Sequence, residues 1–195
     1  MKSVLISIQP KWCELIASGK KTVEVRKTKP KLATPFKVYI YCTKGKFEPS
    51  ECLRNNLHYD DSTIKVCEGQ GKVIGEFVCD SIDYVRNYGD AVDWYDCKAS
   101  CLSANEIIEY AKDKNGNFVY TYGWHISDLV IYDKPRELSE FYQKGKNNIH
   151  FYYDYCAGCP NHETPVGEYP CNECDGNRKY LYTPPQSWCY VEGLE

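Results

Sequence analysis

The sequence has no long hydrophobic run. The apolar stretch after Met1 and Lys2 is only five or six residues long, which is far too short for a signal-peptide core or a membrane span. No internal repeat, low-complexity segment or known targeting motif is visible either. These absences argue against a secreted or membrane-spanning protein, and we therefore expect a cytoplasmic protein with no membrane partner.

A strong excess of one charge is also missing. The 195 residues carry a formal net charge of −3, which argues against a protein that coats nucleic acid. The basic residues are nevertheless concentrated near the start, because residues 1–46 contain eleven Lys or Arg against only Glu14 and Glu24. This asymmetry indicates a basic face on an acidic protein, unless the fold interleaves the charges.

Tyrosine and cysteine, by contrast, are abundant, with 18 Tyr and 12 Cys. Tyrosine offers a flat stacking surface with a polar tip, which suits a base-binding cleft, although most of these rings are expected simply to serve the core and surface. In a cytoplasmic protein, cysteines are expected to be reduced, buried or bound to metal rather than joined in disulfides.

Four of the cysteines have the spacing of a zinc site. Cys156, Cys159, Cys171 and Cys174 form the pattern C-x2-C-x11-C-x2-C. Four thiolates at this spacing close a tetrahedron around Zn²⁺, and a site with four protein ligands is structural rather than catalytic. Unligated thiols, an iron–sulfur centre and a redox pair are the alternatives. We predict a structural Zn²⁺ here.

The apolar pattern predicts short strands, separated by turns and accompanied by one or two helices. Strands are expected at residues 4–8, 22–26, 36–43, 71–82, 118–124 and 129–132. A helix is predicted from Pro10 to about Gly19, and a second helix after a capping box that begins at Ser103. Residues 44–70 are expected to form a long loop. The fold class is therefore α+β, with a small β-barrel and flanking helices.

The composition changes after about residue 142. Residues 143–180 are rich in Asn, Gly, Pro and Cys and poor in aliphatic side chains, so a metal rather than a core is expected to hold them together. We therefore predict a zinc-knuckle or ribbon module in this segment.

The most specific polar pattern lies at residues 19–26. An alternating strand places Thr22, Glu24 and Arg26 on one face, with two valines on the other. The carboxylate accepts hydrogen bonds from an exocyclic amine of a base, and the guanidinium clamps a phosphate or a base edge. The alternative is a surface ion pair of little consequence.

Gly19, Lys21, Glu24 and Arg26 fit the pattern Gly-x-Lys-x-x-Glu-x-Arg, which resembles the signature of the ASCH domain family. These domains are small barrels of the PUA-like superfamily and are associated with RNA and modified nucleobases. The resemblance extends more loosely over residues 1–142, and residues 184–191 look like the last barrel strand of phage and bacterial members. It implies a barrel at 1–142, a zinc module inserted at 143–180 and a closing strand within 181–195.

The family binds its ligand in a cleft between the first helix and the signature strand. The resemblance therefore implies a binding site formed by Gln9, Lys11, Trp12, Lys21, Glu24 and Arg26. Trp124 and His125 are weaker candidates; Trp12 fits a core anchor equally well, and His125 fits a structural histidine. The expected ligand is single-stranded RNA or a modified nucleoside.

One branch of the family hydrolyses the acetyl amide of N4-acetylcytidine with a Lys, a Thr nucleophile and a Glu. Lys21 and Glu76 match two of these residues, but Glu24 occupies the Thr position. The alternative function is therefore an amidohydrolase of a modified nucleoside, or a ribonuclease, in which Lys21, Glu24 and Glu76 converge and Glu24 acts as a general base. A protein-interaction role is a third possibility without a positive sign in the sequence.

Overall fold

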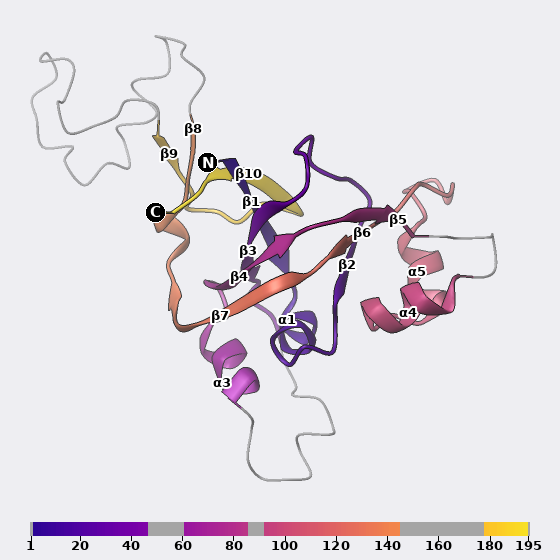
Figure 1. Cartoon of the computed structure of the whole chain (residues 1–195), viewed down its shortest axis with the longest axis horizontal. Helices are drawn as coiled ribbons and strands as arrows, with labels where there is room; N and C mark the ends of the chain where they lie inside the picture. Colours follow the sequence, from indigo (N-terminus) through magenta and orange to yellow (C-terminus); the bar gives the residue numbers. More distant parts are fainter. Residues whose placement is uncertain (1, 47–60, 86–91, 145–177, 195) are drawn as a thin grey trace, which may run out of the picture.

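The computed structural model describes residues 2–46, 61–85, 92–144 and 178–194 (Figure 1). Its largest element is a five-stranded sheet with the order β10-β1-β3-β4-β7. The strands are β1 (Lys2–Ile8), β3 (Phe36–Cys42), β4 (Val73–Cys79), β7 (Ser127–Arg136) and β10 (Trp188–Glu192). Strand β1 lies between β10 and the central strand β3; it is parallel to β3 and antiparallel to β10, so segments from the two ends of the chain lie side by side.

A second, three-stranded sheet has the order β2-β6-β5 and is antiparallel throughout. It contains β2 (Val23–Arg26), β5 (Ile82–Tyr84) and β6 (Tyr122–His125). The chain passes from β6 into β7 through the single residue Ile126, which links the two sheets.

The predicted closed barrel is not observed in the described residues, because the two sheets do not share a continuous ladder of strands. They meet through side chains instead: the ring of Trp124 in β6 lies 5.9 Å from the ring of Trp188 in β10. The α+β class is confirmed, with two sheets in place of one barrel.

The main core lies on the face of the five-stranded sheet that packs against the second sheet and α1 (Pro10–Ala17). Val4, Ile6 and Ile8 of β1 point into it, as the alternation of strand side chains requires, and α1 adds Cys13 and Ile16. Pro10 suits the first turn of α1 because it needs no backbone N–H there. The helix is followed by Gly19 in the left-handed conformation, with a φ of 71°.

A second core covers the opposite face of the same sheet. Leu5 and Tyr39 pack there against Phe141, Leu181 and their neighbours. The short elements on this side are η1 (Leu138–Glu140), β8 (Tyr142–Lys144) and β9 (Arg178–Tyr180), and β8 pairs with β9. Strands β1 and β3 are therefore buried on both faces, whereas the edge strand β7 leaves residues such as Val130 exposed.

The described residues also contain the helices α3 (Asp61–Glu68), α4 (Trp94–Ser100) and α5 (Ala104–Tyr110). The predicted capping box at the start of α5 is confirmed, since the hydroxyl of Ser103 accepts a hydrogen bond from the Glu106 amide. Helix α3 lies inside the segment predicted as a loop, and its Val66 is buried in the main core. None of the helices in the described ranges has the length and apolar character that a membrane span requires.

The predicted zinc ligands Cys156, Cys159, Cys171 and Cys174 lie outside the described residues, so the zinc module and the domain division stay predictions. Within the described ranges, no group of three or more His, Cys, Asp or Glu side chains is placed to hold a metal ion.

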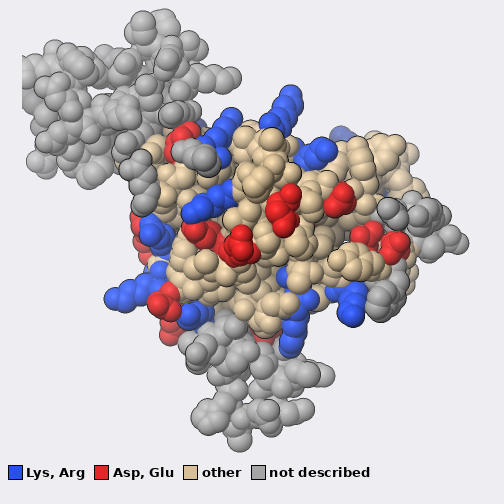
Figure 2. Space-filling view, viewed as in Figure 1, with Lys and Arg blue, Asp and Glu red and all other residues tan. Residues whose placement is uncertain are grey.

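Acidic and basic side chains are interspersed on the face shown in Figure 2 and do not merge there into a basic patch. Several of the basic residues near the start of the chain are paired with carboxylates. Lys11, Lys21, Arg26 and Lys37 each form an ion pair with a glutamate. The fold thus interleaves charges that the sequence separates.

Candidate ligand-binding cavity

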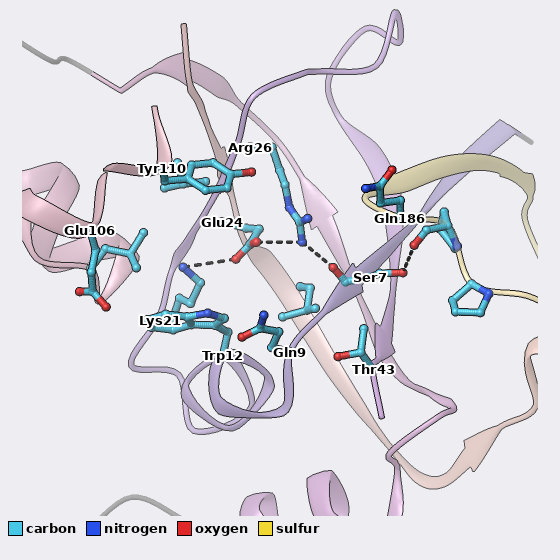
Figure 3. Close-up of a pocket in the computed structure, with 15 residues that line it drawn as sticks. Ser7, Gln9, Trp12, Lys21, Glu24, Arg26, Thr43, Glu106, Tyr110 and Gln186 are labelled. Carbon is cyan, nitrogen blue, oxygen red and sulfur yellow. Dashed lines mark hydrogen bonds and ion pairs between the residues drawn. The ribbon is translucent and has the colours of Figure 1, made fainter. Parts of the chain in front are cut away.

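A cavity of about 590 Å³ lies beside α1, β2, α5 and the segment that precedes β10 (Figure 3). Its polar walls come from Gln9, Lys21, Glu24, Arg26, Thr43, Glu106 and Gln186. Its apolar and aromatic walls include Ile8, Trp12, Leu102, Tyr110, Pro184 and Pro185. Five of the six residues that the family resemblance implies therefore line one hollow.

Lys21 is held in the wall just before β2 begins. Its backbone N–H donates to the carbonyl oxygen of Leu15, so the end of α1 fixes its position. The side chain is only 2% exposed, and its Nζ donates to the carbonyl oxygen of Ser100 at 2.7 Å. Because β2 starts at Val23, Lys21 precedes the strand, and strand alternation does not fix the direction of its side chain. Its Nζ lies 3.3 Å from Oε2 of Glu24.

Glu24 and Arg26 project from the same face of β2, as the alternation predicts. Nη2 of Arg26 lies 3.0 Å from Oε1 of Glu24 and donates to the carbonyl oxygen of Ser7 at 2.6 Å. The side chains of Glu24 and Arg26 are 8% and 11% exposed. Lys21, Glu24 and Arg26 therefore form a buried network, called here the charge triad, of two cations around one carboxylate.

One donor of the charge triad has no partner. Nε of Arg26 is buried and makes no hydrogen bond with any described residue. A buried unsatisfied donor costs about 1–3 kcal/mol, and an acceptor from a ligand or from ordered water relieves that cost. The unsatisfied donor belongs to a residue of the cavity wall, although the nitrogen itself is buried.

The mouth of the cavity is formed by more exposed groups. Gln9 is the N-cap residue of α1, yet its side chain makes no capping hydrogen bond and is exposed. Lys11 does not line the cavity; its Nζ lies 4.2 Å from the ring centre of Trp12 and 3.9 Å from Oε1 of Glu106. Lys11 therefore contacts two wall residues without lining the cavity itself.

Several wall residues were not predicted from the sequence. Tyr110 ends α5, and burial raises the pKa of its hydroxyl. Pro184, Pro185 and Gln186 precede β10 and reach the cavity because β10 pairs with β1. Sequence patterning gives no sign of this approach, since about 160 residues separate these prolines from β2.

Glu76 does not join the charge triad. It lies on β4 opposite Tyr39, which belongs to the second core, so it projects from the face of the five-stranded sheet opposite the main core. Its carboxylate accepts hydrogen bonds from Nζ of Lys37 and from the hydroxyl of Tyr132, both at 2.6 Å. The expected convergence of Lys21, Glu24 and Glu76 is therefore not observed, because strand alternation in β4 turns Glu76 away.

The two weaker candidates also lie outside the cavity wall. Trp124 is fully buried in the main core, where its ring meets Phe36 edge-on at 6.1 Å. His125 follows it on the other face of β6, and its Nδ1 lies 2.6 Å from a carboxylate oxygen of Asp80. Both residues have structural contacts, although the buried indole N–H of Trp124 finds no acceptor among the described residues.

Comparison with known proteins identifies the family of the chain. The ASCH domain family matches residues 6–153, and the chain therefore belongs to the ASCH domain family. Crystal structures of an ASCH protein from Zymomonas mobilis are similar to it at 16% sequence identity. The narrower assignment of the present chain to the phage and bacterial type of the family stays a prediction.

The structural matches cover nearly the whole chain. A Tyr-to-Phe variant of the Zymomonas mobilis protein gives a TM-score of 0.50, covering 98% of this chain and 91% of that one. A Ser-to-Ala variant gives 0.50, covering 97% and 88%. At this identity the likeness establishes the fold alone. No curated protein shows significant similarity to the chain.

Proposed function

We propose that the cavity binds a nucleobase, presented as a modified nucleoside or within single-stranded RNA. The observation that carries the proposal is the buried charge triad in the wall of a cavity that also contains two aromatic rings, Trp12 and Tyr110. Membership of the ASCH family, whose PUA-like fold is associated with RNA, supports the same ligand class.

The size and lining of the cavity suit a flat ligand with polar edges. Small-molecule pockets typically enclose about 300–1,000 Å³ and combine apolar walls with a few placed polar groups. The volume of about 590 Å³ falls in this range. Aromatic rings and prolines can contact the faces of a base, while the charge triad and two amide side chains can contact its edges.

The charge triad offers both kinds of hydrogen-bonding group. Glu24 accepts with lone pairs that its two cations leave free, and Arg26 has a donor without a partner. Two cations around one carboxylate leave the cluster with a net positive charge. This excess favours a ligand edge with carbonyl or phosphate oxygens beside an amine.

The geometry supports binding better than the alternative hydrolase or ribonuclease. That mechanism requires Lys21, Glu24 and Glu76 in one pocket, and Glu76 is satisfied elsewhere by Lys37 and Tyr132. Lys21 is itself held by Glu24 and a backbone carbonyl, as a fixed positive charge. Among the described wall residues, the hydroxyl of Ser7 donates to the carbonyl oxygen of Pro185, and no contact to a general base activates a nucleophile.

Calorimetric titration with a panel of nucleosides, including N4-acetylcytidine, tests the proposal. We expect at least one nucleoside to bind with one-to-one stoichiometry. Gln9→Ala and Gln186→Ala should each weaken that affinity about two- to tenfold, since each removes amide hydrogen bonds worth about 0.5–1.5 kcal/mol. Both residues are exposed, so the melting temperature should not change.

Gln70→Ala is the matched control, because Gln70 lies outside the cavity wall and bonds the backbone of Gly45. It should bind the nucleoside like the wild type. A panel in which no nucleoside binds, or equal affinities for the two cavity variants and the control, would contradict the proposal.

A further inference from the structure

A row of tyrosines leads away from the cavity across the second sheet. Tyr122 of β6 pairs with Arg26 of β2 on one side and with Tyr84 of β5 on the other. Residues paired across antiparallel strands project from the same face, so these three side chains share the face that carries the charge triad. The ring of Tyr120 lies next in line, with its centre 5.5 Å from that of Tyr84. We call Tyr122, Tyr84 and Tyr120 the tyrosine row.

The outer rings of this row are exposed to solvent. Tyr84 is 57% exposed and Tyr120 is 78% exposed, although Tyr122 and Trp124 of the same sheet pack in or against the main core. The ring centres of Tyr122 and Tyr84 are 5.2 Å apart, so the row is continuous. Exposed aromatic side chains that cluster indicate a contact surface, whereas single ones need no explanation.

Lysine side chains accompany the rings. Nζ of Lys29 lies 5.2 Å from the ring centre of Tyr122 and 5.8 Å from that of Tyr84. Nζ of Lys27 lies 5.2 Å from the ring of Tyr110, which lines the cavity. Cations beside exposed rings match a ligand in which phosphates alternate with flat bases.

We infer that the tyrosine row is a path for single-stranded RNA, with nucleotides that flank the base in the cavity stacking on its rings. The inference rests on the proposed function of the cavity. Sheets that display aromatic rings stack two or three bases of single-stranded RNA, and lysines beside them contact the backbone. A duplex cannot use this surface, because its bases are already stacked inside the helix.

The test compares a nucleoside with an oligonucleotide on the same variants. Fluorescence anisotropy measures the affinity of a labelled, unstructured RNA decamer of mixed sequence, and calorimetry measures the best nucleoside of the panel. Wild-type protein should bind the decamer at least about tenfold more tightly than the nucleoside. Tyr84→Ala combined with Tyr120→Ala should weaken decamer binding at least about tenfold and leave nucleoside binding unchanged.

Tyr95→Ala is the matched control, because Tyr95 is 67% exposed on α4 and belongs to no ring pair of the row. It should bind the decamer like the wild type. Lys29→Ala should also lower the slope of log affinity against log salt by about 0.7, the value for one phosphate contact on a single strand. The exposed Lys134 of β7 provides the control substitution Lys134→Ala.

Each remaining outcome discriminates between the two claims. If the nucleoside binds but the decamer binds no tighter, or the double variant retains decamer affinity, the row has no role and the cavity proposal stands. If the double variant loses affinity for the nucleoside and the decamer equally, the tyrosine row affects binding only by stabilising the fold, and the inference is overturned. Equal affinity for duplex RNA or single-stranded DNA overturns the assignment to single-stranded RNA. Binding of neither probe overturns both claims.

Discussion

Two strand glutamates have the same appearance in the sequence and opposite surroundings in the structure. Glu24 and Glu76 each lie between apolar neighbours in a strand, and each pairs with a lysine. The carboxylate of Glu24 contacts two buried cations beside a cavity. The side chain of Glu76 is 22% exposed, and its two partners are Lys37 and Tyr132.

The difference shows where a polar group is left to act on a ligand. Around Glu76, Lys37 and Tyr132 satisfy the carboxylate, and Glu76 is not among the residues that line the cavity. Around Glu24, the cavity adjoins the network, and Nε of Arg26 has no hydrogen-bond partner in the part of the chain that the structure describes. A glutamate in a strand therefore indicates a site only together with the packing around it.

The largest expected effect is on stability. Glu24→Gln removes the single negative charge between Lys21 and Arg26 and leaves two buried cations without a counter-charge, which should cost about 3–5 kcal/mol of unfolding free energy. Glu76→Gln keeps one hydrogen-bonding side chain in a more exposed place and should cost about 1 kcal/mol. Urea unfolding measures both, and equal losses would remove the distinction between the two glutamates.

The next largest effect is on ligand affinity. Arg26→Lys keeps the charge but loses the planar fork that spans Glu24 and the Ser7 carbonyl, so nucleoside binding should weaken at least about tenfold. Arg136→Lys is the control, since Arg136 at the end of β7 pairs with Glu140 of η1 and does not line the cavity. Calorimetry that finds the same affinity for both variants would count against the role of Arg26.

A smaller effect is expected in the acid range. Burial alone raises the pKa of Glu76, but hydrogen bonds from Lys37 and Tyr132 outweigh burial and hold the pKa below its usual value of 4.5. A lowered folded-state pKa contributes stability above about pH 4.5 that is lost as the pH falls through the folded value. Glu76→Gln should therefore flatten the fall in melting temperature between about pH 5 and pH 3.

The same pH series on Glu109→Gln provides the comparison. Glu109 is an exposed residue of α5 that pairs with Lys112 three positions along the chain. This variant should follow the wild-type curve. A curve for Glu76→Gln that runs parallel to the wild type would contradict the assigned role of Lys37 and Tyr132.

The smallest effect on the cavity is expected from metal removal. We predict one Zn²⁺ per chain in freshly purified, reduced protein, bound by the four cysteines at 156, 159, 171 and 174. Strands β8 and β9, which flank that segment, lie on the side of the second core. Chelation should therefore leave nucleoside affinity within about twofold. Absence of zinc by elemental analysis would refute the metal site, and loss of nucleoside binding would place it at the cavity.

Much of the fold follows from local sequence signals. Pro10 and Gly19 bracket α1, alternation defines β2 and β3, and the capping box at Ser103 starts α5. These signals act over a few residues, so a single sequence contains them. The separation into two sheets does not follow, because it depends on how Trp124 and Trp188 pack between strands distant in sequence.

The part of the cavity wall that comes from residues close in sequence was also predictable. The spacing of Lys21, Glu24 and Arg26 within one segment places them together, and the ASCH resemblance adds Gln9 and Trp12. Tyr110 and Gln186 come from α5 and from the segment before β10, and only tertiary packing brings them to the cavity. The prediction that Glu76 joins the cavity was wrong for the same reason, since the face of the sheet from which Glu76 projects is set by cross-strand register.

The most direct test is a crystal structure of the protein with the nucleoside that binds best. The account predicts that the base occupies the cavity, with a polar edge within hydrogen-bonding distance of Arg26 or Glu24 and a face against Trp12 or Tyr110. A nucleoside found elsewhere, such as in the hollow beside His125 and Asp80, would contradict it.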